Sequence, residues 1–392
     1  MTALAPGTET ELAEAVATAA AAKTPLEIRG GGSRLAIGRP VQAEATLATR
    51  GLDGITLYEP GALTLVVQAG TRLAQVEETL AAEGQRLPFE PMDHRFLLGT
   101  EGEPTVGGMV ATAASGPRRV QAGACRDAML GVRFVNGRGE VIRNGGRVMK
   151  NVTGYDLVKL MAGSHGTLGV LTEVAFKVLP APERALTLVI EGLEDARAVE
   201  AMACAMTSPF EVTGAAHLPP ESDGVAARTL LRIEGMAGQA DYRAEQVAQR
   251  LAGFGPAERL EGAEHEAVWL GIRDVRQFAG RPGAVWRLAL KPSDAPKAVA
   301  AVRAALDCEA LYDWAGGRVW VLTRDAGDAG AAAIRAQTAR LGGHATLIRA
   351  SAATRAAVEV FEPEPEAVAR FSRGLRARFD PAGILNPGRM RA

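Results

Sequence analysis

The sequence predicts an α+β protein of two domains, and three observations favour this fold class. The chain has 392 residues, 47% of them hydrophobic, which is enough to bury two cores. Its first half contains three glycine-rich loops between strand and helix patterns: Gly30–Gly32, Thr105–Gly108 and Gly163–Gly169. Beyond Pro182 these loops stop, and apolar strand patterns alternate with alanine-rich helical patterns.

We place the domain boundaries where this character changes. The expected parts are a first domain over 1–182, a second domain over 183–345, and a C-terminal segment, 346–392, that returns to the first domain.

The first domain opens with a helical pattern over residues 10–23. Leu26–Arg29 alternates like a strand and leads into the first glycine loop. A strand over 63–70 precedes a helix that Gly84 ends. Asn136–Gly139 separates two further strand patterns and predicts a hairpin.

The second domain alternates strands with helices. The strand patterns are 186–190, 229–233, 285–290 and 318–322. The amphipathic helical patterns lie near 194–206, 239–252, 293–306 and 328–341. With weaker strands between them, these steps predict two ferredoxin-like units side by side in one antiparallel sheet covered by helices.

The composition of the chain disfavours several classes of protein. A net charge of −1 gives no basic field for nucleic acid or an anionic membrane. The N-terminus lacks a signal-peptide pattern, and no apolar run is long enough to span a bilayer. The cysteines are odd in number and far apart: Cys125, Cys204 and Cys308. We therefore expect a cytoplasmic protein without disulfides or an iron–sulfur cluster of its own.

The three loops predict a site for a long ligand with several phosphates, because consecutive small residues gather backbone N–H donors in a concave nest. Arg29 directly precedes the first loop and is a candidate for a charge near the phosphates. A surface position that merely ends the strand is the alternative. A Rossmann site is disfavoured and a P-loop excluded, because neither fingerprint occurs in the sequence.

The order of the motifs resembles the FAD-linked oxidase family of the vanillyl-alcohol oxidase type, and within it the E subunits of bacterial glycolate oxidases. The segments that carry the resemblance are 25–33, 105–109, 150–156 with 163–169, and 380–388. Together they span nearly the whole chain.

The resemblance implies an FAD-binding domain of two α+β subdomains and a cap domain with an antiparallel sheet. It also implies a set of cofactor-binding residues: Arg29, Gly30, Gly31, Gly32, Ser33, Thr105, Gly107, Gly108, Gly163, Gly166, Gly169, Val170 and Asn386. Gly169 and Val170 would present backbone to the flavin ring or adenine. Asn386 would lie near the isoalloxazine, and a purely turn-forming role for it stays equally open.

Two departures from the family pattern bear on chemistry. Members that tether FAD use a histidine in the first loop, often with a cysteine in the second. Here Ser33 and Arg34, then Thr105 and Val106, stand in those loops, so non-covalent FAD is expected. The hydroxyacid-oxidising relatives also carry a His-x-Gly-Asp-Gly-Asn-x-His metal motif in their later half. This motif is absent here, where the later histidines stand alone: His217, His265 and His344. We therefore expect no metal site.

No catalytic residue is assigned. His94 and His165 lie near the motifs, and for both a role in loop structure is favoured over proton transfer. Lys150 and Arg126 are candidates to stabilise negative charge on a reduced flavin, with solvation or local ion pairs as the alternative.

The resemblance implies the FAD-binding subunit of a glycolate oxidase or dehydrogenase complex, which oxidises a small 2-hydroxy acid to a 2-oxo acid. A second FAD-linked oxidase subunit would carry the metal motif, and an iron–sulfur subunit would take the electrons. Attachment to the inner face of the membrane would come through partners. A stand-alone oxidase of another alcohol or lactone, and a flavin-bearing scaffold without redox turnover, remain open.

The second domain is the expected docking surface for these partners, because the loops of the first domain face the cofactor. Trp269 and Trp314 are the expected surface anchors, since aromatic side chains are enriched at interfaces. Trp286 and Trp320, in strand patterns, are expected in the core.

Overall fold

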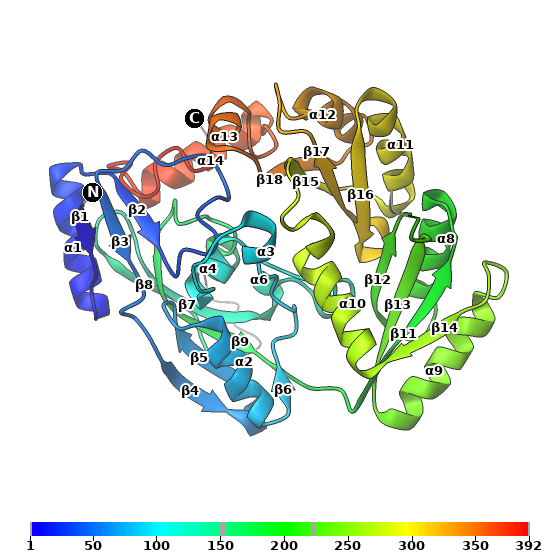
Figure 1. Cartoon of the computed structure of the whole chain (residues 1–392). Helices are drawn as coiled ribbons and strands as arrows, with labels where there is room; N and C mark the ends of the chain where they lie inside the picture. Colours follow the sequence, from blue (N-terminus) through cyan, green and yellow to red (C-terminus); the bar gives the residue numbers. More distant parts are fainter. Residues whose placement is uncertain (1, 149–153, 221–223, 391–392) are drawn as a thin grey trace. The chain divides into compact units, whose positions relative to one another are not determined.

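A computed structural model describes residues 2–148, 154–220 and 224–390 (Figure 1). The chain divides into two compact units. The first unit comprises Met1–Ser115, Gly123–Ala181 and Pro363–Ala392, and the second comprises Gly116–Ala122 and Pro182–Glu362.

This division corrects the expected boundaries in two places. Residues 346–362 lie in the second unit, because β18 (His344–Arg349) pairs with β15 (Ala284–Ala289) in the sheet of that unit. Residues 116–122 also lie there, and the Gly116 carbonyl accepts a 3.0 Å hydrogen bond from the Trp314 indole N–H. Both contacts join segments distant in sequence, which a sequence pattern does not reveal.

The first unit begins with a three-stranded parallel sheet. Its order is β1 (Thr2–Leu4), β3 (Ala45–Ala48), β2 (Leu26–Arg29). Helix α1 (Glu9–Ala22) packs on this sheet, with Leu12 and Val16 fully buried against Leu26 and Leu47 (Figure 1). The expected first helix and strand are confirmed, and β2 ends directly at the first glycine loop.

A five-stranded antiparallel sheet forms the rest of the core of this unit. Its order is β4 (Ile55–Glu59), β5 (Thr64–Gln68), β9 (Val170–Lys177), β7 (Met129–Val135), β8 (Val141–Gly145). The helices whose apolar residues join its core are α2 (Leu73–Ala82), α4 (Val106–Ala111) and α7 (Leu157–Met161). The hairpin expected at Asn136–Gly139 is the β7–β8 connection.

Five short elements and one long helix complete the first unit. The short elements are η1 (Pro60–Ala62), β6 (Gln85–Arg86), α3 (Arg95–Leu98), α6 (Cys125–Ala128) and β10 (Leu179–Pro180), and the helix is α14 (Glu366–Phe379). After α14 the chain returns to the small sheet. The Leu26 amide donates to the Ile384 carbonyl at 2.8 Å, and Leu26 forms a bridge with Leu385. The C-terminal turn therefore lies alongside β2, from its first residue onward.

The second unit is built on one eight-stranded antiparallel sheet. Its order is β14 (Glu258–Glu261), β11 (Arg184–Glu191), β13 (Arg228–Gly235), β12 (Val212–Leu218), β16 (Cys308–Asp313), β17 (Arg318–Thr323), β15, β18. In chain order each half reads strand, helix, strand, strand, helix, strand, which is the ferredoxin-like pattern. The expected pair of units in one sheet is confirmed, and β12 and β16 join them.

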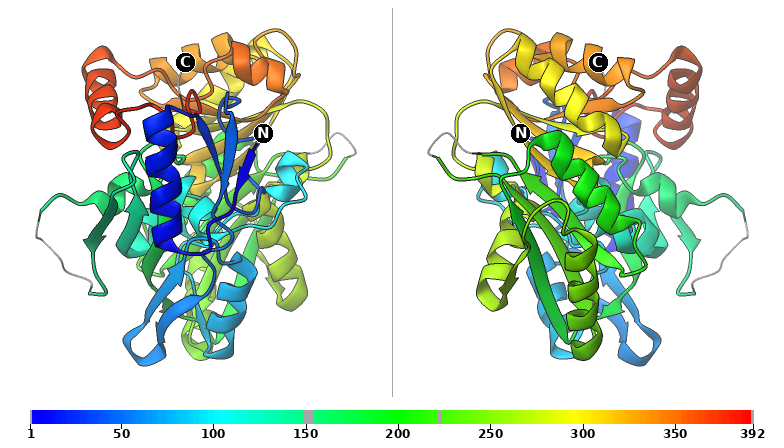
Figure 2. Two further views of the ribbon diagram at one scale, coloured as in Figure 1. Left: turned by 90° about the vertical axis from the view of Figure 1, so that its left-hand side faces the viewer. Right: turned by 90° about the vertical axis from the view of Figure 1, so that its right-hand side faces the viewer.

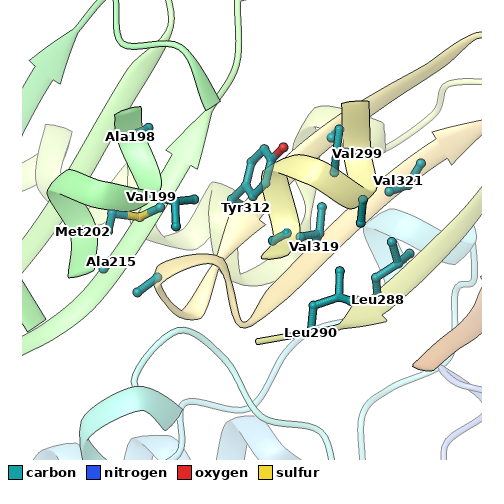
Figure 3. Packing of buried hydrophobic residues seen from close by; sticks show 14 of the residues in the cluster. Ala198, Val199, Met202, Ala215, Leu288, Leu290, Val299, Tyr312, Val319 and Val321 are labelled. Carbon is teal, nitrogen blue, oxygen red and sulfur yellow. The ribbon is translucent and has the colours of Figure 1, made fainter. Parts of the chain in front are cut away.

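Helices cover one face of this sheet, as the α8 and α9 ribbons show (Figure 2). The helices that contribute to the core are α8 (Asp195–Met206), α9 (Ala237–Arg250), α11 (Ala295–Ala305) and α12 (Ala331–Arg340). Met202 of α8 and Val299 of α11 belong to one buried cluster with strand residues such as Ala215 and Val319 (Figure 3). The other elements of the unit are α5 (Arg119–Ala122), α10 (Gly262–Asp274), η2 (Arg276–Phe278), η3 (Pro292–Asp294), η4 (Trp314–Gly316) and α13 (Ala352–Ala357).

Trp286 and Trp320 are buried, as expected. The two predicted surface anchors, Trp269 and Trp314, are not exposed on the surface. Trp269 is only 2% exposed, so its assignment as an anchor is wrong. Its N–H donates to Thr187 Oγ1 at 2.7 Å, because α10 turns this residue toward the sheet. Trp314 is half-buried, and its ring stacks against the guanidinium groups of two arginines: Arg119 and Arg318.

Among the described residues, none of the helices combines the length and apolar character needed to span a bilayer.

Candidate functional site

A cavity that opens to solvent lies in the first unit where the glycine loops and the C-terminal turn meet, with about 740 Å³ of space between the protein atoms and at its mouth. Most of the predicted cofactor-binding residues line this cavity: Gly30, Gly31, Gly32, Ser33, Thr105, Gly107, Gly108, Gly166, Gly169 and Asn386. Three loops far apart in sequence thus form one wall.

The first and second loops lie in direct backbone contact. A Cβ atom on Gly31 would lie 1.7 Å from the Glu103 carbonyl oxygen, and one on Gly30 would lie 2.4 Å from Thr105 Oγ1. Gly32 also forms a bridge with Glu103. Glycine is required here because the first loop packs directly on the backbone of the segment that leads into the second loop.

The second loop begins α4 under the cap of Thr105, whose Oγ1 accepts from the Gly108 amide at 3.4 Å. Gly107 faces Ala69, and a Cβ there would lie 3.0 Å from the Ala69 carbonyl. Gly108 differs, since a Cβ on it would meet only side-chain atoms: Thr105 Oγ1 at 3.3 Å and Arg34 Nη1 at 3.8 Å. A side chain at position 108 would therefore grow toward the guanidinium group in the cavity wall.

Asn386 connects the third loop to β2. Its Oδ1 accepts from the Ile28 amide at 2.8 Å, and its Nδ2 donates to the His165 carbonyl at 2.8 Å. Gly166 has φ +71°, and a Cβ there would lie 2.7 Å from Asn386 Nδ2. The Asn386 amide thus organises the cavity wall, which agrees with the structural role left open for it.

Arg34 is one of two arginines in the cavity lining, with Arg389, and the sequence did not lead us to assign it to the site. Its side chain donates to the Met92 carbonyl at 2.9 Å, to His94 Nδ1 at 3.3 Å and to Ser33 Oγ at 3.5 Å. Burial lowers the pKa of its guanidinium to about 10, so it remains positive at neutral pH. Its position directly after the first loop was the available signal.

Arg29, in contrast, does not line the cavity. It pairs with Glu27 at 2.8 Å, and its side chain is 42% exposed. Residues two apart in a strand share a face, so Arg29 and Glu27 meet on one side of β2 while Ile28 faces the cavity. The positive charge beside the first loop is therefore that of Arg34, five positions after Arg29.

Gly163 and Val170 lie behind the cavity wall. Gly163 has φ +81°, and its amide donates to the Val110 carbonyl at 3.0 Å, which closes the third loop against α4. Val170 begins β9 and is fully buried in the core beneath the small sheet. The strand-core alternative for Val170 therefore describes its surroundings.

The remaining lining residues were not among the predicted cofactor-binding residues: Ile28, Arg34, Leu35, Ile37, Thr49, Ala111, Thr112, His165, Leu171 and Arg389. Ile28 and His165 lie within the family motifs and Arg34 directly follows the first, whereas most of the others lie outside these motifs. Arg389 is 5% exposed and holds the first loop in place. Its guanidinium donates to the Leu35 carbonyl at 2.8 Å and to Glu27 Oε1 at 3.2 Å.

Other candidate groups have local roles. His94 is buried, and its Nδ1 accepts a hydrogen bond from Arg34. Cys125 is also buried, which raises the pKa of its thiol to about 12, so it stays protonated at neutral pH. Arg126 lies 3.7 Å from Asp127, and Lys150 lies outside the described residues. Within the described ranges, no group of three histidine, cysteine or carboxylate side chains is arranged to hold a metal ion.

Comparisons with known proteins bear on this site. The family model described as "FAD binding domain" matches residues 2–145, which include the first two loops. Glycolate oxidase subunit GlcE of Escherichia coli is 37% identical over 384 residues, covering 97% of each chain. The chain belongs to the FAD-linked oxidase family. Its cavity is the candidate flavin site of that family's FAD-binding domain.

Three further similarities cover either a part of this FAD-linked oxidase chain or its fold alone. Glycolate oxidase subunit GlcD of Bacillus subtilis is 27% identical over 66% of this chain and 52% of its own. 4-Ethylphenol oxidase from Gulosibacter chungangensis superposes with a TM-score of 0.75 at 15% identity, over 99% of this chain and 88% of its own. Alkyldihydroxyacetonephosphate synthase superposes with a TM-score of 0.70 at 16% identity, over 98% and 76%. The latter two show a shared architecture.

The cavity suits two parts of FAD in chemical terms, the pyrophosphate and a flat ring. Backbone amides of the first loop and the guanidinium group of Arg34 suit the pyrophosphate in the middle of the molecule. Apolar side chains in the lining suit a flat ring system: Ile28, Leu35, Ile37 and Leu171.

Proposed function

We propose that the chain is the FAD-binding subunit of a glycolate oxidase or dehydrogenase complex that oxidises a small 2-hydroxy acid to a 2-oxo acid. The observation that carries this proposal is the similarity to GlcE of E. coli along nearly the full length of both chains. The oxidation removes two electrons and two protons, one proton from the alcohol carbon and one from its hydroxyl group. Bound FAD would supply the acceptor for the two electrons.

The FAD is held without a covalent bond in this proposal. Ser33 and Thr105 stand at the cavity where tethered relatives place a histidine or cysteine. Backbone amides, Arg34 and the Asn386-organised third loop supply non-covalent contacts instead. These residues bind and orient the cofactor, and none of them is assigned a proton-transfer role.

The proposed partners are a second FAD-linked oxidase subunit carrying the metal motif and an iron–sulfur subunit. Two relatives are named as different subunits of glycolate oxidase, GlcE and GlcD, which supports a complex of two flavoproteins. The iron–sulfur subunit is inferred from what the chain contains: three cysteines are too few for a four-cysteine cluster. In this proposal electrons leave the flavins through that subunit.

Activity of separate and assembled subunits tests the proposal. The purified chain should not oxidise glycolate or D-lactate appreciably with an artificial acceptor, whereas the co-expressed complex should. The reason is that a metal beside the hydroxyl would stabilise its deprotonated form, and this group comes from the partner. Robust turnover by the chain alone that chelators do not inhibit would favour a stand-alone oxidase. A complex that turns over equally well when this chain carries no flavin would favour a scaffold.

A further inference from the structure

Helix α14 (Glu366–Phe379) exposes a stripe of apolar side chains, here called the α14 stripe: Val368, Phe371 and Leu375. Their exposed fractions are 48%, 69% and 39%, although all three are large hydrophobic residues. They stand at positions i, i+3 and i+7, so they share one side of the helix. Within this fully described helix only Ala369 is buried, so α14 contributes little to the core.

The charge on the same helix is strongly positive. Four arginines stand against a single glutamate: Arg370, Arg373, Arg376 and Arg378 against Glu366. Arg373 pairs with Glu366 at 2.5 Å, and the Arg370 guanidinium lies 5.8 Å from the centre of the Phe371 ring. A partner that covers the α14 stripe therefore meets cations beside it, which favours a surface with acidic residues at its rim.

We propose that α14 docks into an apolar groove with an acidic rim on the second FAD-linked subunit. This inference rests on the proposed function and names the element that this chain contributes to the assembly. Apolar anchors at i, i+3 and i+7 are typical of a helix that binds in a protein groove. The predicted anchors Trp269 and Trp314 do not compete, because their rings already pack against neighbouring side chains.

The composition of the helix disfavours two other occupants. A helix that lies in a membrane interface needs a broad apolar face, and the α14 stripe is one residue wide with Arg378 next to it on the helical wheel. A second copy of the chain would bring two arginine-rich helices together, which like-charge repulsion opposes.

Three side chains bury far less than the roughly 1,200 Å² of a stable protein interface, so α14 is one element of a larger contact. Loss of its central aromatic anchor should weaken assembly by about tenfold or more, the effect typical of a well-packed anchor residue.

Co-purification tests this inference. The full chain, tagged, is co-expressed with the GlcD-type and iron–sulfur subunits of the same organism, and captured partner is quantified. The test variants are Phe371→Ser, the triple serine replacement of the α14 stripe, and the pair Arg370→Glu with Arg378→Glu. Val141→Ser is the matched control, since Val141 is 46% exposed on β8 of the same unit. FAD content and circular dichroism verify that each variant is folded.

We expect the control to capture partner as the wild type does, and the α14 variants to keep FAD while capture falls about tenfold or more. Charge reversal should have the larger effect at low salt. Undiminished capture by the triple variant overturns the docking inference and leaves the subunit assignment intact. A wild-type chain that captures no partner overturns both. Two other outcomes also overturn the groove proposal. In one, the wild type binds phosphatidylglycerol vesicles, and the α14 variants lose this binding but capture as much partner as the wild type. In the other, the wild type self-associates, and the α14 variants lose self-association but not capture.

Discussion

At the scale of single residues, the candidate site depends on which side chains the first loop turns inward. The sequence was sufficient to locate the loop, because three consecutive glycines before a serine indicate a backbone that passes close to a ligand or to another segment. It was not sufficient to choose between Arg29 and Arg34. Arg29 follows the alternation of β2 and pairs with Glu27, whereas Arg34 follows the turn and enters the cavity wall. That choice depends on the path of the chain after β2.

Replacing Arg34 with Met should reduce FAD affinity by about 10- to 100-fold, since a charge-assisted contact contributes roughly 1.5–3 kcal/mol. The measurement is the dissociation constant of FAD by fluorescence quenching on deflavinated protein. Arg29→Met is the matched control and should change affinity little, because its side chain lies outside the cavity lining. A larger loss in the control than in the Arg34 variant would refute the assignment.

Replacing Gly108 with Val should nearly abolish FAD binding, because the branched side chain would project toward Arg34 Nη1. Gly61→Val is the comparison, since a Cβ at Gly61 meets nothing within 4 Å. The readout is flavin per chain from the visible absorbance of purified protein. Equal flavin content in both variants would remove Gly108 from the site.

At the scale of elements, periodicity predicted the strands and helices of the second unit and their ferredoxin-like order. The joint between the two halves was not predictable, because it depends on one edge contact, His217 opposite Tyr312. Asp195 at the start of α8 secures that joint. Its Oδ2 accepts from the Tyr312 hydroxyl and from Arg303 Nη1, both at 2.7 Å.

Asp195→Asn should destabilise the second unit by about 2 kcal/mol at pH 7, the usual scale for a lost charge-assisted hydrogen bond. Burial opposes ionisation of Asp195, but hydrogen bonds from His217 and Tyr312 and the charge of Arg303 hold its pKa below the ordinary value of 3.8. A lowered pKa stabilises the folded state above pH 3.8, and this contribution is lost as pH falls through the lower folded value. The melting-temperature difference between variant and wild type should therefore shrink in strong acid. A difference independent of pH would contradict this origin.

At the scale of the whole molecule, the sequence was sufficient to predict two units and the return of the C-terminus to the first. The reason is that the C-terminal signature and the glycine loops belong to one family pattern. The placement of residues 116–122 and 346–362 in the second unit was not predictable, since it depends on contacts such as Trp314 with Gly116. The docking role proposed for α14, which lies in the first unit, was also not predicted. The sequence favoured the second domain as the docking surface, because exposure of Phe371 is a property of the folded chain.

The central claim is that this chain holds its own FAD, without a covalent bond, in the cavity of the first unit. The most direct measurement is the flavin released when the purified chain is precipitated with acid. We expect about one FAD per chain in the supernatant and none in the pellet, because Ser33 and Thr105 offer no tethering group at the cavity. A purified, folded chain without flavin, or flavin that stays with the precipitated protein, would contradict the account.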